Sequence, residues 1–289
     1  MRLSELAALG LCCACYSAHA SEPERTPPAS APRAALTVAA APRCPAEMAE
    51  VERPQGSFCI DRWEATLAWR RPNLPATPWP GNRAVDGREA ELFAESAAGR
   101  MPQGYISGDQ AERACVNAGK RLCEIDEWTR ACRGPRGRTY PYGDERRAGV
   151  CNDRFKTLDA HPVERLYDQL KPKDMARLRM WEPFFMNDPR LHELSQTVER
   201  TGSRSGCVTE TGVYDLVGNL HEWVADPAGT FVGGFFMDTR QNGEGCGYRT
   251  TAHRRDYRDY STGFRCCADV QRSVAAAPID TAPSRSITP

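Results

Sequence analysis

The cysteines constrain this chain more than any other residue type. The sequence has 13 cysteines in 289 residues, and Cys12, Cys13 and Cys15 lie within the first twenty. The ten that remain are an even number, which is typical of disulfide pairing in an exported protein. We therefore expect at least three disulfides and little regular secondary structure. Ten cysteines can pair in about a thousand ways, so the sequence indicates no connectivity.

The first twenty residues have the features of a secretory signal peptide. Arg2 supplies a positive charge, residues 6–14 form a short apolar stretch, and Ala18-His19-Ala20 fits a small-residue cleavage site. The apolar stretch is too short for a permanent membrane span, and no other segment is apolar enough to be one. We expect an exported protein, periplasmic or secreted. The alternative is a lipoprotein with its lipid anchor at Cys15.

Composition divides the rest of the chain. Residues 21–43 are rich in proline and alanine and are expected to form a linker, and residues 272–289 are expected to form a loose tail. The folded domain then covers residues 44–271, and the charged residues 156–200 are interpreted as an insertion on it. The 38 basic and 38 acidic residues balance, so charge indicates neither nucleic acid nor an anionic membrane as a partner.

Periodicity predicts only a few regular elements. Alternation over residues 58–64 indicates a short strand. Ser107 and its capping-box partner Gln110 start a helix that ends at Gly119. A second helix is expected over residues 122–133, where apolar positions share one face.

The insertion is expected to carry a helix of its own. Asp188 fits its cap, Pro189 its first position, and the apolar positions on one face are Leu191, Leu194 and Val198. We expect His161 and His192, in the same segment, to be solvated.

One stretch, residues 212–226, concentrates oxygen-bearing side chains among apolar ones. Asp215, Asn219, Glu222 and Asp226 supply carboxylates and an amide at close spacing. Such a set suits a calcium loop, although it is not an EF-hand. The alternative is a turn flanked by core residues, with Asp215 and Glu222 solvated.

Four motifs, in order along the chain, resemble one family. They are Lys120-Arg121-Leu122-Cys123 with Glu127-Trp128, Tyr140-Pro141-Tyr142-Gly143, Val213 to Trp223, and Gly263-Phe264-Arg265-Cys266. In this order they look like the formylglycine-generating enzyme, or sulfatase-modifying factor, family. The resemblance covers about residues 44–269, with the insertion outside the usual pattern. It implies an α+β fold of the C-type-lectin-like kind, with much ordered loop.

The resemblance also implies structural calcium. The family's ligands at the first site correspond to the side chains of Asp215 and Glu222 and the carbonyl groups of Gly218 and Leu220. A second family site starts at an asparagine that corresponds to Asn152, and its later aspartate has no counterpart that we can place across the insertion.

The catalytic residues depart from the family pattern. Family enzymes that oxidise a substrate cysteine bind copper(I) through two thiolates, which suit a soft metal. Here Phe235 replaces a serine, Asp238 stands in place of the first cysteine, Cys246 matches the second, and His221 replaces a tryptophan. One thiolate cannot make the two-cysteine site, so copper-dependent formylglycine generation is not expected. Cys246 also has an alternative role as a disulfide partner, as do Cys207, Cys266 and Cys267.

A different metal site is an alternative. His221, Asp238, Cys246 and His253 offer nitrogen, oxygen and sulfur ligands, and some members of the broader family are non-haem iron enzymes. Two histidines without a defined ligand spacing more commonly make hydrogen bonds at a surface or groove.

Aromatic and basic residues suggest a groove for a peptide or small-molecule ligand near Phe235 and Arg254. The aromatic candidates are Phe231, Phe235, Phe236 and Tyr248, for which a core position is the alternative. The basic candidates are Arg249, Arg254, Arg255 and Arg258, for which a solvated face is the alternative.

Two function classes follow from the sequence. One is an exported oxidoreductase that acts on a cysteine or a small substrate. The other is a calcium-stabilised binding module that keeps the scaffold without the copper chemistry. The residues at Phe235, Asp238 and His221 favour the binding module.

Overall fold

The computed structural model describes residues 43–154, 160–167 and 180–271, which belong to one compact unit of residues 41–289. The predicted signal peptide, nearly all of the predicted linker, and the predicted tail lie outside the described residues. Within the described part of the chain, no helix is long and apolar enough to cross a membrane.

The first sheet joins the two ends of the domain. Its order is β1 (Met48–Val51), β2 (Phe58–Asp61), β11 (Cys266–Asp269) and β6 (Arg121–Leu122), and all of its neighbours are antiparallel. The strand expected over residues 58–64 is therefore present, but it ends at Asp61. It lies between two neighbours, so all four of its side chains are buried.

The second sheet carries the candidate site. Its order is β10 (Thr262–Phe264), β7 (His221–Trp223), β8 (Phe231–Val232) and β9 (Arg249–Thr250), and β10 is parallel to β7. Only Arg265 separates β10 from β11. The chain therefore passes from the second sheet to the first at this residue.

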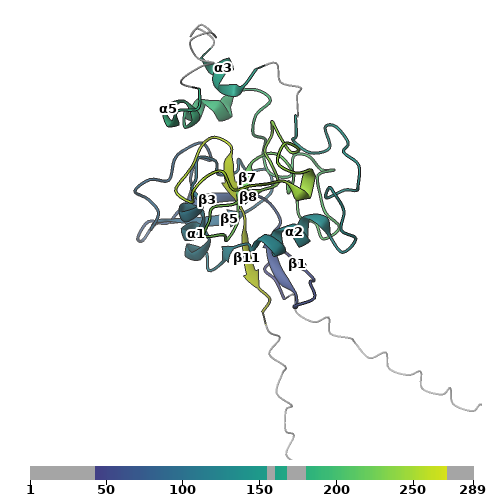
Figure 1. The fold of residues 1–289 in the computed structure, drawn as a ribbon. Coiled ribbons are helices and arrows are strands. Elements are labelled where there is room, and N and C mark those ends of the chain that lie inside the picture. Colours follow the sequence, from purple (N-terminus) through teal and green to yellow (C-terminus); the bar gives the residue numbers. More distant parts are fainter. Residues whose placement is uncertain (1–42, 155–159, 168–179, 272–289) are drawn as a thin grey trace, which may run out of the picture. The chain divides into compact units, whose positions relative to one another are not determined.

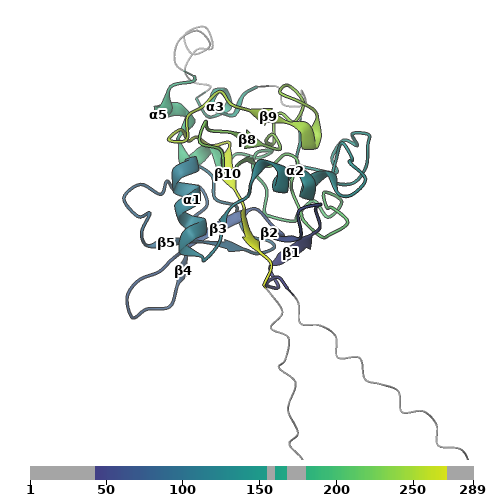
Figure 2. The same cartoon turned by 60° about the horizontal axis from the view of Figure 1, so that its bottom comes forward.

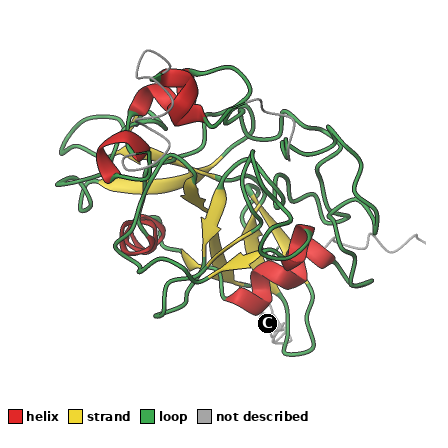
Figure 3. Ribbon diagram, turned by 45° about the horizontal axis from the view of Figure 1, so that its top comes forward, coloured by secondary structure: helices red, strands yellow, loops and turns green. Residues whose placement is uncertain are grey.

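The third sheet packs beside the first helix. It consists of β4 (Thr77–Pro78), β3 (Ala65–Trp69) and β5 (Leu92–Ser96). Figure 2 shows α1 (Gly108–Asn117) alongside this sheet. Most of the remaining chain is loop, as Figure 3 shows, which confirms the expected α+β fold with few regular elements.

The cap of α1 forms as the sequence predicts. The Ser107 side chain accepts from the Gln110 amide, the Gln110 side chain accepts from the Ser107 amide, and Gly119 follows the helix with a φ of +72°. The second helix, α2, covers Ile125–Arg133 and starts later than expected. Leu122 is paired with Cys266 in the first sheet, so a long-range strand pairing overrides the local helical pattern.

The insertion packs on the domain through short helices. Those among the described residues are α3 (Pro162–Leu166), α5 (Pro183–Met186) and the 3₁₀ helix η1 (Pro189–Glu193), and the first two are labelled in Figure 1. Asp188 caps η1 as predicted, with its side chain accepting from the Arg190 amide, but η1 ends before Leu194. Val163, Met186 and Leu191 bury against Tyr105, Phe236 and Tyr260.

The two histidines of the insertion are not solvated, contrary to expectation. His192 is buried, and its Nε2–H donates to the carbonyl oxygen of Tyr260 at 2.5 Å. His161 is half-buried, caps α3 and lies 2.8 Å from the Tyr260 hydroxyl through Nε2. Because the insertion contributes to a core cluster, these two histidines bond inward, to Tyr260.

All ten cysteines of the described residues are paired, which confirms the expected disulfides. The bonds are Cys44–Cys59, Cys115–Cys266, Cys123–Cys267, Cys132–Cys246 and Cys151–Cys207. Cys266 and Cys267 are consecutive in β11, so their side chains point to opposite faces. One therefore bonds to α1 and the other to the segment after β6. The four C-terminal cysteines pair with earlier ones and not with one another.

Candidate functional site

The stretch at residues 212–226 contains a tightly curled interior loop followed by β7. Asp215, Gly218 and Asn219 have φ values of +59°, +82° and +60°, in the left-handed region. A Cβ added at Gly218 would overlap the carbonyl oxygen of Asn152, so only glycine fits this close approach. The alternative of solvated carboxylates is wrong, because Asp215 and Glu222 are both buried.

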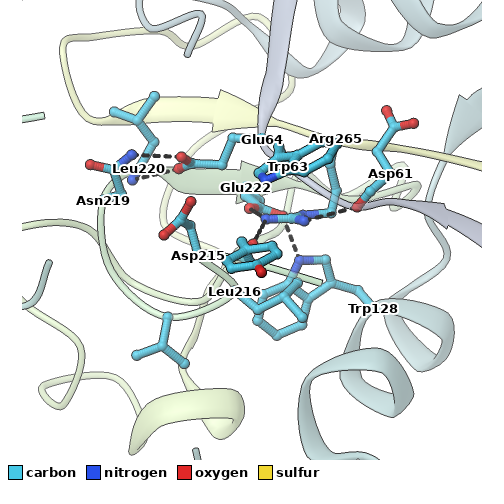
Figure 4. Close-up of polar contacts among 12 residues, drawn as sticks. Asp61, Trp63, Glu64, Trp128, Asp215, Leu216, Asn219, Leu220, Glu222 and Arg265 are labelled. Carbon is cyan, nitrogen blue, oxygen red and sulfur yellow. Dashed lines mark hydrogen bonds and ion pairs between the residues drawn. The ribbon is translucent and has the colours of Figure 1, made fainter. Parts of the chain in front are cut away.

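Arg265 binds Glu222 in the core. Its Nε and Nη2 each donate to a different carboxylate oxygen of Glu222 at 2.6 Å. The Nε1–H of Trp128 also donates to Glu222, at 2.6 Å, and Nη2 of Arg265 donates to the Tyr214 carbonyl at 2.8 Å. These contacts, drawn in Figure 4, fix the Glu222 carboxylate between two sheets and α2.

A third carboxylate, Glu64, completes this cluster. It accepts hydrogen bonds from Nδ2 of Asn219 at 2.5 Å and from the Leu220 amide at 3.1 Å. Burial raises the pKa of Glu64 well above its usual range, and the charges of Asp215 and Glu222 add to that rise.

The cluster holds more acidic than basic groups. Asp215 accepts from the Gly202 amide at 2.6 Å, and burial raises its pKa to about 6. Three buried carboxylates, Glu64, Asp215 and Glu222, therefore face the single guanidinium of Arg265. Excess negative charge in the interior must be balanced by protons or by a cation.

The residues expected to bind calcium offer oxygen atoms of the kinds that this ion prefers. Within the described residues, no group donates a hydrogen bond to the carbonyl oxygens of Gly218 or Leu220. Together with Asp215 and Glu222 they offer the mixed carboxylate and backbone oxygens that calcium prefers. Glu222 would have to share its oxygens with Arg265. At the second site, Oδ1 of Asn152 is buried without a partner in the described structure.

A separate pocket of about 790 Å³ opens beside the second sheet and the insertion. Its walls combine aromatic rings, imidazoles and carboxylates. The aromatic residues are Trp181, Phe231, Phe235, Tyr248, Tyr257 and Tyr260, the histidines are His161, His221 and His253, and the acids are Asp238 and Asp259. The structure thus places four of the candidate residues, His221, Asp238, His253 and Phe235, on the wall of this pocket together with residues of the insertion.

His221 forms part of the pocket wall and is buried. Its ring centroid lies 4.5 Å from that of Phe231 and 4.7 Å from that of Phe235. Burial lowers its pKa to about 3, and the neighbouring His253 lowers it further. The pKa of His161 falls to about 4 and that of His253 is also lowered, in both cases through burial. The pocket imidazoles are therefore neutral near pH 7.

The histidines and Asp238 do not form a ligand set. The ring of Phe231 lies against both His221 and His253, with centroid distances of 4.5 and 5.7 Å. Among the described residues, no three His, Cys, Asp or Glu side chains are grouped to hold a metal ion by side chains alone, so this pocket offers no such ligand set. Cys246 does not line the pocket, and its sulfur is bonded to Cys132, so it is not a thiolate in this structure.

Of the basic candidates, Arg254 lies outside the pocket. Its side chain is 87% exposed and pairs with Asp256. Arg255 pairs with Asp109 and Glu112 on α1, and Arg258 pairs with Asp86. The alternative of a solvated face holds for Arg254, whereas the side chains of Arg255 and Arg258 are largely covered in their ion pairs. Phe236 is fully buried, so its core alternative also holds.

Several site residues were missed by reasoning from sequence. Glu64 gave no signal, because it lies far along the chain from the loop it contacts. Arg265 belonged to a recognised motif but had no role assigned. Asp259 and Ser261 were overlooked, although their position directly before β10 offered a hint, since neighbouring parallel strands start at one edge.

These features define a disulfide-stapled α+β domain with a buried acidic cluster and an aromatic–histidine pocket. Residues 77–270 match the model of the sulfatase-modifying factor enzyme 1-like domain, and the chain belongs to this family.

Solved structures similar to this chain include three proteins. Treponema denticola variable protein 1 is 10% identical with a TM-score of 0.44, over 80% of this chain and 93% of that one. CarF is 16% identical with a TM-score of 0.38, over 75% and 87%. PvdO from Pseudomonas aeruginosa is 12% identical with a TM-score of 0.39, over 77% and 90%.

Proposed function

We propose that this chain is an exported, calcium-stabilised binding module that holds a ligand in the aromatic–histidine pocket and does not generate formylglycine with copper. One observation carries the proposal. All ten cysteines of the described residues are in disulfides, and none of the residues that line the pocket is a cysteine.

The chemistry of the pocket supports binding. Copper(I) is a soft ion that needs soft ligands such as thiolates, whereas Asp238 offers a hard oxygen. A concave pocket of several hundred cubic ångströms, with many aromatic groups and a few polar ones, is typical of ligand sites. This pocket has both properties, at about 790 Å³.

Export and calcium rest on separate observations. Five disulfides persist in oxidising compartments and are rare in reducing ones. The excess of buried carboxylates over guanidinium groups around Arg265 supports a bound cation at Asp215 and Glu222.

The test of the proposal supplies copper(I), oxygen, a thiol reductant and a Cys-x-Pro-x-Arg peptide, and follows the peptide mass. We expect no conversion. Because a reductant can open the Cys132–Cys246 disulfide, the same assay is run with Cys246→Ser. Conversion by the natural chain that disappears in Cys246→Ser would show that this sulfur serves catalysis and would overturn the proposal.

The second candidate is an oxidoreductase of the same family that uses non-haem iron. The observation in its favour is that His221, Asp238 and His253 line one pocket. Calorimetric titration with iron(II), compared between the natural chain and His253→Ala, tests this candidate. Tight binding that depends on His253 would favour it over the binding module.

A further inference from the structure

One wall of the pocket is built around a fixed carboxylate. Oδ1 of Asp238 accepts hydrogen bonds from the backbone amides of Arg240 at 2.9 Å and of Gln241 at 3.0 Å. These two bonds hold Oδ1 in place. Its second oxygen, Oδ2, lies 3.3 Å from the hydroxyl of Tyr248.

The tautomer of His221 follows from its neighbours. The hydroxyl of Ser261 donates its single proton to Oδ1 of Asp259, at 2.7 Å. Ser261 can then only accept from His221, whose Nδ1 lies 3.2 Å from the Ser261 oxygen. Nδ1 therefore carries the proton, and Nε2 presents a lone pair to the hydroxyl of Tyr248 at 3.4 Å.

This wall has too few donors for its acceptors. Tyr248 has one hydroxyl proton, which cannot satisfy both Oδ2 of Asp238 and Nε2 of His221. Its oxygen already accepts from Asn242 at 3.2 Å. The contacts of Tyr248 with Asp238 and His221 are both at the long end for hydrogen bonds.

The charge of the wall is negative, and its surroundings are apolar. The carboxylate of Asp238 and the imidazole of His221 both approach the hydroxyl of Tyr248, and the rings of Phe231 and Phe235 lie against His221. The cation that lines the same pocket, Arg154, is paired with Glu199 at 2.7 Å. Aromatic faces attract cations and also cover alkyl chains.

We propose that the pocket binds a protonated primary amine, with its ammonium group between Asp238, His221 and Tyr248 and its carbon chain against Phe231 and Phe235. A primary ammonium has three N–H donors and no acceptor, which is the complement of this wall. The proposal rests on the proposed function, since it names the ligand class of the same pocket. A lysine side chain and a free alkylamine share this chemistry.

The experiment compares four probes with the same butyl chain. They are n-butylamine, n-butanol, butyrate and butyltrimethylammonium, each titrated into the full chain at pH 7 and followed by calorimetry and by tryptophan fluorescence, since Trp181 lines the pocket. We expect n-butylamine to bind at least tenfold more tightly than the other three. Butanol lacks the charge, butyrate has the opposite charge, and the trimethyl probe has the charge without N–H donors.

Variants test the assigned residues. Asp238→Asn keeps an oxygen for the backbone amides but removes the charge, and we expect it to weaken n-butylamine binding about tenfold or more. His221→Phe keeps a ring between the phenylalanines without Nε2, and we expect binding about threefold weaker or more. The matched control is Asp256→Asn, which removes an equal charge from a 66% exposed side chain outside the pocket. Thermal melting verifies that each variant folds.

The outcomes distinguish a failure of the amine assignment from a failure of the proposed function. Equal binding of n-butylamine by the natural chain and Asp238→Asn overturns the amine assignment. Tighter binding of butanol or butyrate that Phe235→Ala weakens also overturns it, while the pocket remains a ligand site. Binding of none of the four probes overturns the amine assignment, and the copper and peptide test judges the proposed function independently. The full expected order in the natural chain and in Asp256→Asn, together with weaker n-butylamine binding in both pocket variants, supports the amine assignment.

Discussion

Arg265 and Glu222 form a two-point ion pair in the protein interior, with Nε and Nη2 of the arginine each 2.6 Å from a different carboxylate oxygen. Glu222 lies in β7, and Arg265 lies between β10 and β11. The pair therefore fixes the place where the chain passes from one sheet to the next. Removing one member of a buried pair leaves an unbalanced charge, which costs about 3–5 kcal/mol.

We predict that Arg265→Met lowers the free energy of unfolding by about 3–5 kcal/mol, because it leaves the buried carboxylates without their guanidinium. Urea denaturation followed by circular dichroism measures the change. Arg254→Met, at an exposed position, is the control and should stay within about 0.5 kcal/mol of the natural chain. Equal stability of the two variants would contradict the structural role of Arg265.

Two glycines with similar backbone angles give a matched test of the tight loop. Gly218 has a φ of +82° and Gly99 a φ of +71°, but only Gly218 faces another backbone, at Asn152, whereas a Cβ at Gly99 meets nothing within 4 Å. Alanine costs about 1–2 kcal/mol at either position through the left-handed conformation. Gly218→Ala should cost at least about 2 kcal/mol more, since the overlap forces the loop apart. Equal denaturation midpoints for Gly218→Ala and Gly99→Ala would show that the loop at Gly218 tolerates the added side chain.

Acid should destabilise the protein through His192. Burial lowers its pKa to about 4 in the folded chain, whereas the unfolded chain titrates near 6.5. Between these values the unfolded chain binds a proton that the folded chain excludes, so the free energy of unfolding falls as the pH falls from 6.5 to 4. This loss in the free energy of unfolding reaches about 3 kcal/mol at pH 4.

His192→Gln tests this dependence because the amide can still donate to the Tyr260 carbonyl but does not titrate. We expect the natural chain to be more stable than the variant at pH 7.5, and this advantage to shrink steadily below pH 6.5. Urea titrations at intervals of half a pH unit measure it. A constant difference between the two proteins would mean that folding leaves the pKa of His192 unchanged.

Local signals in the sequence predict only part of the fold. The capping box at Ser107 and the cap at Asp188 act within three residues, so they are visible without tertiary information. The start of α2 was predicted too early because Leu122 pairs with Cys266, far along the chain. The short helices α3 and α5 are stabilised by packing and not by their own length, so periodicity could not find them.

The sequence likewise predicts only some residues of the candidate site. Asp215 and Glu222 were visible as close-spaced oxygens, and His221 and Asp238 as departures from a family motif. Their surroundings were not visible. Glu64 reaches the acidic loop only through the fold, and the pairing of Cys246 with Cys132 depends on where α2 packs.

Calcium should stabilise the protein through Asp215. Chelation should lower the melting temperature by about 5 to 10 °C, because an ion at a hundredfold excess over its dissociation constant contributes about 2.7 kcal/mol. The stabilisation should be largest above pH 6 and shrink below it, since burial raises the pKa of Asp215 to about 6 and a proton then competes with the cation.

Two variants test whether Asp215 is the residue that binds calcium. Asp215→Ala should abolish the response to chelator. Asp226→Ala, in the same stretch, should keep it, because that carboxylate accepts from the Ala228 amide and the Thr230 hydroxyl instead of joining the buried cluster. The response is the difference in melting temperature between scans with and without chelator. A general loss of stability in either variant lowers both melting temperatures and therefore cancels. A melting curve that chelator leaves unchanged in the natural chain rejects the calcium site, and the excess charge of the cluster is then balanced by protons on Glu64 and Asp215.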